Sequence, residues 1–188
     1  MAETKNATKA VDATTASNVM RQLRVEKIVL NCGCGTDHTR LEKSHKLLQI
    51  ITGRTPVKVV TQKRIPGWGL RPGLPIATKV TLRGPLAEET LKRLLKANDN
   101  MLKPNHFDSA GNIAFSVHEC IDIPGVEYDP TIGILGLQVT VTLQRPGFRI
   151  RRRKYMNRKI PHASMIAPQE AMDFAQSAWG IKIQTEDQ

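Results

Sequence analysis

The chain has 188 residues, of which 40% are hydrophobic and 24% charged, and its net charge is +11. This length predicts one substantial hydrophobic core, and no apolar run approaches the roughly 20 residues of a membrane-spanning helix. Three cysteines do not make a disulfide framework, which indicates reduced thiols in the cytoplasm. Residues 1–19 show no hydrophobic period and no apolar signal segment, and they predict a disordered N-terminal extension.

Basic residues are concentrated in two long segments that contain no acid. The segment from Lys43 to Ala87 holds nine Lys and Arg, and the segment from Pro130 to Gln169 holds eight. Acids kept away from long basic segments indicate a surface that meets a polyanion, and nucleic acid is the commonest such partner. A solvated basic face is the alternative interpretation.

The segment 25–34 alternates in polarity. Ile28 and Leu30 fall on one face, whereas Val25 and Asn31 fall on the other. This period of two predicts a strand with one apolar face. Helical spacing of leucines then predicts a helix over 37–52 that ends at Gly53.

The same patterns continue along the chain. A second helix is predicted from Pro85, and a Pro/Gly-rich loop from Ile65 to Pro75. In the strand predicted over 78–83, the apolar Val80 and Leu82 alternate with a basic, hydrogen-bonding row. That row consists of Lys79, Thr81 and Arg83. The remaining predicted strands are 57–60, 113–117 and 137–143.

The element order β-α-β-β-α-β-β, with single-faced strands, predicts an α+β fold. We expect an antiparallel sheet with both helices packed on one face and an open, polar, RNA-binding face. After Gln144 the chain becomes a basic C-terminal arm, followed by a short terminal helix from Pro168 that docks on the core. The predicted organisation is an extension (1–19), an α+β core (20–144), and the arm with its helix (145–188).

Gly33 and Gly35 lie between a strand and a helix, as in a dinucleotide-binding fingerprint, but His38 replaces the third glycine. A tight strand-to-helix turn is therefore the preferred interpretation. Cys32, Cys34 and His38 lack a fourth ligand at zinc spacing, so the cysteines are predicted to be small core residues. No catalytic group, metal or cofactor is predicted.

Two further features allow alternatives. Trp68 lies among glycines and arginines, either as a buried anchor of its loop or as a surface contact with RNA. The acidic stretch from Glu119 to Asp129 is predicted to be a solvated loop, with a metal site or a basic protein partner as alternatives. Aromatic residues make up only 4% of the chain, which favours phosphate, ribose and shape contacts with folded RNA over base stacking.

Motifs from Met20 to Ile183 resemble the family of large-ribosomal-subunit protein number five, the universal 5S rRNA binder, in its archaeal and eukaryotic branch. The segments that carry the resemblance include MRQLR (20–24), KIVLN (27–31), TGRTP (52–56), KVTLRG (79–84), IDIPGVEYDP (121–130) and RPGF (145–148).

The resemblance implies a structural, non-enzymatic protein that attaches 5S rRNA to the central protuberance and whose projecting loop contacts the P-site tRNA. It implies 5S rRNA contacts at Asn31, Gln62 and Thr81, to which the strand pattern adds Lys27, Lys63, Lys79 and Arg83. The tRNA-contacting residues would be Arg64, Trp68 and Arg71. Two departures from the family pattern are Cys32 and Cys34, where aliphatic residues are usual, and Pro72, where a lysine is common.

The resemblance further implies that the basic arm is a feature of the archaeal and eukaryotic branch, in which it would reach large-subunit or 5S rRNA. Because like charges repel, we expect it to be disordered alone and to fold on RNA. Its predicted rRNA-binding residues are Arg149, Arg151, Arg152, Arg153, Lys154, Arg158 and Lys159.

The expected partners are 5S rRNA, large-subunit rRNA, the P-site tRNA, neighbouring ribosomal proteins and a small-subunit protein across the subunit bridge, with no membrane. The expected location is the cytoplasmic ribosome. A free-standing RNA-binding or chaperone protein and a nucleotide-binding enzyme are the alternatives.

Overall fold

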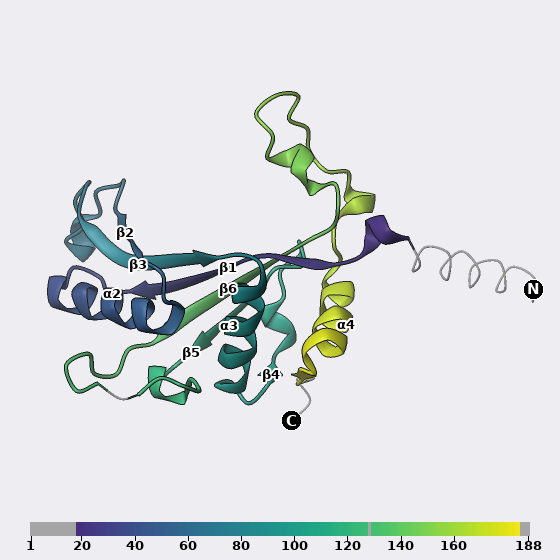
Figure 1. Cartoon of the computed structure of the whole chain (residues 1–188). Coiled ribbons are helices and arrows are strands. Elements are labelled where there is room, and N and C mark those ends of the chain that lie inside the picture. Colours follow the sequence, from purple (N-terminus) through teal and green to yellow (C-terminus); the bar gives the residue numbers. More distant parts are fainter. Residues whose placement is uncertain (1–17, 128, 185–188) are drawn as a thin grey trace, which may run out of the picture.

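The computed structural model describes residues 18–127 and 129–184 and centres on one five-stranded sheet, in which every neighbouring pair is antiparallel (Figure 1). The spatial order is β2-β3-β1-β6-β5. The strands are β1 (Arg24–Gly33), β2 (Val57–Val60), β3 (Pro75–Leu82), β5 (Ile113–Val117) and β6 (Leu137–Gln144). The helices are α2 (His38–Thr52), α3 (Pro85–Lys96) and α4 (Pro168–Trp179).

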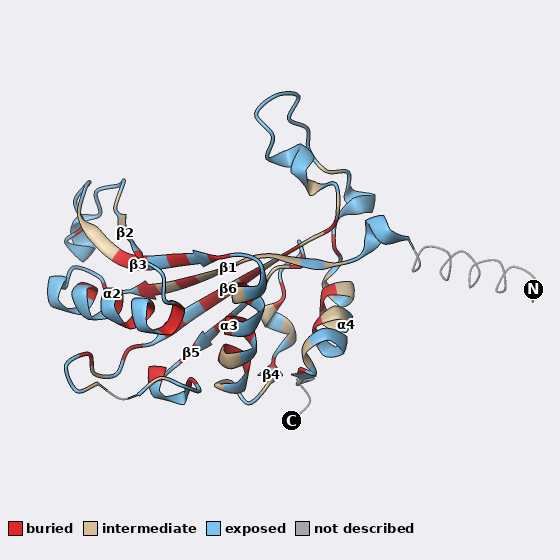
Figure 2. Ribbon diagram, in the orientation of Figure 1, coloured by how far each residue is buried: buried red, intermediate tan, exposed pale blue. Residues whose placement is uncertain are grey.

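The helices α2 and α3 cover one face of the sheet, so the predicted α+β arrangement is confirmed (Figure 1). Ile28 of β1 lies opposite Leu82 of β3 and Val141 of β6, and all three side chains are buried. Burial of an aliphatic side chain of this size contributes about 1.5–3 kcal/mol. Figure 2 shows the buried residues where sheet and helices meet, while the two segments that project from the sheet are exposed.

A bulge near the start of β1 corrects the predicted face of Val25. Val25 pairs with Leu143, but Lys27 pairs with Thr142, so Glu26 is an extra residue without a partner of its own. The extra residue shifts the alternation by one, and Val25 therefore packs against the core, not on the open face.

The predicted terminal helix docks on the core through its buried alanines, Ala171 and Ala175. Two short strands that the sequence analysis did not predict, β4 (Met101–Leu102) and β7 (Lys182–Ile183), pair in parallel. Their pairing joins the segment that follows α4 to the segment that follows α3.

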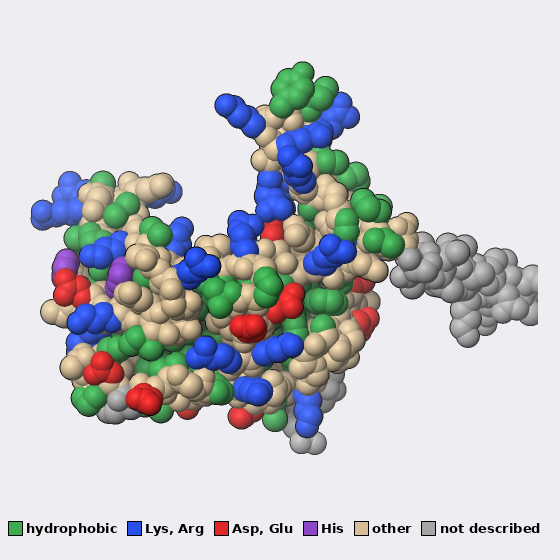
Figure 3. Space-filling model, viewed as in Figure 1, with side chains coloured by type: hydrophobic (Ala, Val, Ile, Leu, Met, Phe, Trp, Pro, Cys, Tyr) green, Lys and Arg blue, Asp and Glu red, His purple; other side chains and the backbone are tan. Residues whose placement is uncertain are grey.

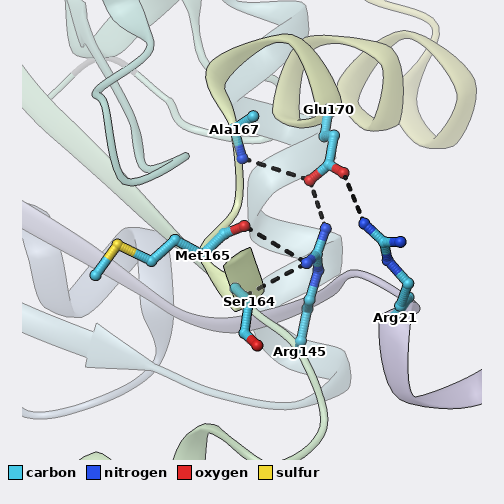
Figure 4. A network of polar contacts seen from close by, with 6 residues as sticks. All are labelled: Arg21, Arg145, Ser164, Met165, Ala167 and Glu170. Atoms are coloured by element: carbon cyan, nitrogen blue, oxygen red, sulfur yellow. Dashed lines mark hydrogen bonds and ion pairs between the residues drawn. The ribbon is translucent and has the colours of Figure 1, made fainter. Parts of the chain in front are cut away.

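An ion-pair network holds α4 to the end of β6 (Figure 4). The carboxylate of Glu170 lies between the guanidinium groups of Arg145, with which it forms a charged hydrogen bond, and Arg21, at 3.7 Å. Arg145 is almost fully buried and also donates to the carbonyl oxygens of Ser164 and Met165, at 3.4 and 3.5 Å. Burial of this arginine depends on its carboxylate partner.

The prediction that Cys32 and Cys34 are core residues is confirmed, since both are buried. The Cys32 thiol donates to the carbonyl of Gly136 at 3.3 Å, and the Cys34 Sγ lies 3.1 Å from Ser44 Oγ. Burial, reinforced by the neighbouring Cys34, raises the pKa of the Cys32 thiol to about 12. The Cys32 thiol therefore behaves as a weakly polar core group.

The predicted N-terminal extension lies outside the described residues except for Asn18 and Val19. The Asn18 side chain accepts a hydrogen bond from the Met20 amide at 2.9 Å and caps a 3-10 helix over Val19–Arg21. Within the ranges 18–127 and 129–184, no helix has the length and apolar character needed to cross a bilayer.

Candidate nucleic-acid interface

The sheet face opposite the helices carries most of the polar side chains of the strands, interspersed with a few small apolar ones. One row crosses all five strands because consecutive partners in the ladder point the same way. Asn31 of β1 is paired with Lys79 of β3 and with Gln138 of β6, and its Nδ2 donates to Gln138 Oε1 at 3.4 Å. The row is Val57, Lys79, Asn31, Gln138 and Ser116.

A second row, Thr81, Val29, Thr140 and Ala114, lies beside the first. Phe115 is the one aromatic residue within the five strands, all of which are described, and it is buried on the core face. The open face therefore offers amide, hydroxyl and ammonium groups, which suit ribose and phosphate oxygens.

Glu26 is the one acidic residue within these five described strands. Its carboxylate forms an ion pair with Arg152 of the basic arm and lies 3.7 Å from Arg83 Nη1. Arg152 also donates to Gln144 Oε1 at 3.1 Å. These contacts fix two arginines, one from the arm and one from the end of β3, beside each other at one end of the open face.

The loop between β2 and β3 projects from the sheet, and backbone hydrogen bonds join its two sides. Backbone hydrogen bonds join Thr61 to Leu74 and Ile65 to Leu70, at 2.9–3.1 Å. Leu70 is the one buried residue of this loop, all of which is described, whereas Trp68 is 72% exposed at the tip. Of the two interpretations of Trp68, the structure therefore supports a surface position.

The basic arm, residues 145–161, is the second projection (Figure 1). A 3-10 helix spans Phe148–Arg151, and the Arg158 amide donates back to the Ile150 carbonyl at 3.4 Å. All seven predicted RNA-binding cations of the arm are exposed. The arm also carries an aromatic residue, Tyr155, with 79% of its surface exposed.

Both projections rise on the side of the sheet that α2 and α3 leave open, and the surface between them is hollowed (Figure 3). Lys and Arg side chains line both projections and the floor between them (Figure 3). Concentrated positive charge on a concave surface attracts a polyanion and orients it.

Comparison with protein families gives two matches that together cover most of the chain. Residues 18–71 match the family described as ribosomal protein L5, and residues 75–174 match the family described as the C-terminus of ribosomal L5 proteins. The chain belongs to the ribosomal L5 family.

Curated relatives agree with this assignment. The chain is 43% identical over 171 residues to large ribosomal subunit protein uL5 of Sulfurisphaera tokodaii, which covers 90% of this chain and 97% of the relative. It is 42% identical to the uL5 protein of Nanoarchaeum equitans, over 87% of this chain and 97% of the relative. With the uL5 protein of Nitrosopumilus maritimus the identity is 40%, over 90% of this chain and 98% of the relative.

The resemblance to the archaeal-type branch is thereby confirmed. As a member of the ribosomal L5 family, the chain is a structural protein of the large ribosomal subunit and not an enzyme. Its location on the cytoplasmic ribosome follows from this membership. The nucleotide-binding enzyme is therefore excluded as an alternative.

The structure brings together five of the seven residues predicted to bind 5S rRNA. Lys27, Asn31, Lys79 and Thr81 share the open sheet face, and Arg83 follows directly at the end of β3. Gln62 and Lys63 lie elsewhere, in the projecting loop beyond the end of β2, and both are exposed. The loop residues Arg64 and Arg71 are exposed as well.

Gln138 and Ser116 were not among the predicted site residues, although they complete the row through Asn31. Both occupy polar positions of alternating segments, and this alternation was the available signal. Their place beside Asn31 depends on strand pairing, which a local pattern does not reveal.

The acidic stretch lies at the far end of β5. Glu119, Asp122 and Glu127 are exposed, and the Pro124 carbonyl accepts a hydrogen bond from Arg93 Nε at 3.1 Å. Hydrogen bonds from the Thr131 hydroxyl and amide hold the pKa of the Asp129 carboxyl below its usual value. No group of three potential metal ligands occurs in the described part of the chain.

Proposed function

We propose that this protein binds 5S rRNA through the open sheet face and attaches it to the central protuberance of the large subunit. The observation that supports this function is the polar row through Asn31 and Lys79, on a sheet face that has a basic projection at each end of its strands. Hydroxyl and amide groups on the sheet contact ribose and phosphate, while the projections grip the RNA backbone on either side.

The lack of an aromatic residue on the open face of the five described strands favours folded RNA over splayed single strands. Modules that read single strands stack bases on aromatic side chains of their sheets. Here the exposed aromatic residues, Trp68 and Tyr155, stand on the projections. The sheet therefore recognises shape and backbone, and the arm adds contacts with 5S or large-subunit rRNA through its seven cations.

The test is binding of the purified protein to 5S rRNA and to an unrelated structured RNA of equal length, across a salt series. We expect tight, selective binding to 5S rRNA that survives moderate salt and that weakens when Asn31 is changed to alanine. Equal binding to both RNAs, with both affinities collapsing together as salt rises, contradicts the proposal because it indicates only non-specific charge attraction.

We also propose that the β2–β3 loop contacts the P-site tRNA through Arg64, Trp68 and Arg71. Backbone hydrogen bonds within the loop fix its shape, and Trp68 is exposed at the tip. Photo-crosslinking from position 68 in ribosomes with and without P-site tRNA tests this contact. A crosslink to tRNA supports it, and crosslinks to rRNA alone in both states contradict it.

Co-sedimentation separates ribosome attachment from a free-standing RNA-binding or chaperone role. We expect the protein to remain with large subunits after a high-salt wash. The acidic stretch around Asp122, which is exposed on the far end of the sheet, is our candidate contact for a small-subunit protein. Crosslinking from this stretch in whole ribosomes identifies that partner.

A further inference from the structure

A pocket lies at the base of the basic arm, outside the residues assigned to RNA contact on the sheet. It has a volume of about 420 Å³, within the range of small-ligand pockets. Its apolar lining comes from the 3-10 helix at Met20 and from the arm at Phe148, Ile150 and Ile160. Segments far apart in the sequence thus line one largely apolar pocket.

The same lining contains cations. Arg21, Arg145 and Lys159 contribute to the pocket, and the surrounding segment from Pro130 to Gln169 contains no acidic residue. Glu170, which contacts two of the lining residues, is engaged by Arg145 and Arg21. A ligand that suits the pocket is therefore flat or apolar in one part and anionic in another.

One group in the lining is incompletely satisfied. Arg145 is only 6% exposed, and its Nε is a buried donor without a hydrogen-bond partner in the described part of the chain. An unpaired buried donor is costly. A ligand that loosens the packing over Arg145 Nε and supplies a hydrogen-bond acceptor removes this free-energy cost of the unbound protein.

We propose that this pocket receives the base of one unpaired nucleotide of bound rRNA. A nucleotide combines a flat base, which stacks on a ring such as Phe148, with acceptors for Arg145 and a phosphate for Arg21 or Lys159. An apolar peptide satisfies the apolar part of the lining but brings no anionic group to Lys159. The inference rests on the proposed function, because the arm and the sheet must already hold RNA, and the nucleotide comes from 5S or from large-subunit rRNA.

The test compares the full-length protein with three variants. Ala163→Leu adds apolar volume to the lining without changing charge, and Phe148→Leu removes the ring but keeps the surface apolar. Ala178→Leu is the matched control, because Ala178 is exposed on α4 and does not line the pocket. Thermal unfolding checks each fold, and if Ala163→Leu fails to fold, Phe148→Leu carries the comparison.

Ribose-acylation probing is applied to 5S rRNA bound to each protein, and to large subunits depleted of this protein and reconstituted with each variant. We expect the wild type and Ala178→Leu to change the reactivity of the same unpaired nucleotide. With Ala163→Leu and Phe148→Leu that nucleotide returns to its free reactivity, and affinity falls roughly tenfold through lost stacking. The RNA that carries the signal identifies the source.

Wild-type affinity and an unchanged footprint for both pocket variants, on both RNAs, overturn the pocket inference and leave the sheet-based function intact. A wild type that does not select 5S rRNA overturns the proposed function, and the probing of reconstituted subunits then decides the pocket separately. A wild type that binds neither RNA overturns both.

Discussion

Glu26 and Arg152 form an ion pair across 126 residues of sequence, and this pair joins the basic arm to the RNA-facing sheet. Glu26 is the extra residue of the β1 bulge, and its side chain is only 10% exposed. A bulge therefore places one acid where it orients two arginines, Arg152 and Arg83, beside each other. The pair gives the arm a contact with the sheet at this point.

Replacement of Glu26 with glutamine should raise the affinity for RNA but reduce selectivity. The change removes the one acid from the five described strands and frees two arginines for any phosphate, so the salt dependence should steepen by up to about one counterion. Stability should fall by no more than about 1 kcal/mol, since both arginines are partly exposed. The measurement is binding to 5S rRNA and to a control RNA across a salt series.

The matched control for this change is Glu88→Gln, which removes an exposed acid from the first turn of α3. Because α3 lies on the opposite face of the sheet (Figure 1), this variant should bind like the wild type. An equal gain of affinity in both variants would mean that net charge alone accounts for the effect.

Thr81 and Leu82 test the assignment of the two sheet faces. Thr81→Ala should weaken 5S rRNA binding without loss of stability, because Thr81 is exposed on the open face. Leu82→Ala should cost roughly 2–5 kcal/mol of unfolding free energy, because this side chain is 2% exposed. Urea unfolding and RNA binding are measured on both variants, and the reverse pattern would show that the register is wrong.

Removal of the Glu170 carboxylate should weaken the docking of α4 on the core. Glu170→Ala leaves the buried guanidinium of Arg145 without its charged partner, which costs up to about 3 kcal/mol because the Glu170 side chain is itself 40% exposed. Asp173→Ala, at an exposed position of the same helix, should change stability by less than about 0.5 kcal/mol. Chemical denaturation of both variants measures the difference, and equal stabilities would argue that the Glu170–Arg145 ion pair does not stabilise the fold.

Gly111 and Gly133 form a matched pair for testing close packing. Both have a positive φ, +73° and +74°, but a Cβ on Gly111 would lie 2.6 Å from Ile166 Cγ2, whereas nothing lies within 4 Å of one on Gly133. Gly133→Ala should cost about 1–2 kcal/mol from backbone strain alone. Gly111→Ala should cost clearly more, and equal midpoints in urea would contradict the packing seen here.

The raised pKa of Cys32 predicts a loss of stability at high pH. An unfolded cysteine loses its proton near pH 9, whereas folded Cys32 keeps its proton to about pH 12. Between these values the folded state binds more protons, so stability falls as pH rises, by up to about 1.4 kcal/mol per pH unit from this group. The difference in unfolding free energy between wild type and Cys32→Ala, followed from pH 8 to 11, isolates this contribution.

The faces of the strands could be predicted from the sequence because alternation is local. Thr81 and Leu82 differ in direction whatever lies beside them, and their segment shows it directly. The bulge at Glu26 could not be predicted in this way, since it arises from the pairing of β1 with β6 more than 100 residues away. For this reason Val25 was assigned to the wrong face and Gln138 was left out of the site.

Side-chain contacts between distant segments also could not be predicted from the sequence. Nothing near Arg152 indicates Glu26 as its partner, and nothing near Phe148 indicates Met20 as its neighbour in a pocket. Two-residue strands such as β4 and β7 are too short to give a periodic signal. The cations of the arm, in contrast, were evident from composition, because a charge cluster needs no pairing to be seen.

The strand order places the first strand, β1, at the centre of the sheet, where its partner β6 follows more than 100 residues later. Long-range pairing of this kind forms slowly, because the chain loses the entropy of closing a long loop before the stabilising contacts between the strands form. Asn31 and Gln138 meet only when β6 is in place, so an incompletely folded molecule presents half of the row. Selective recognition of 5S rRNA by this face would thus select finished molecules for assembly and leave unfinished chains behind.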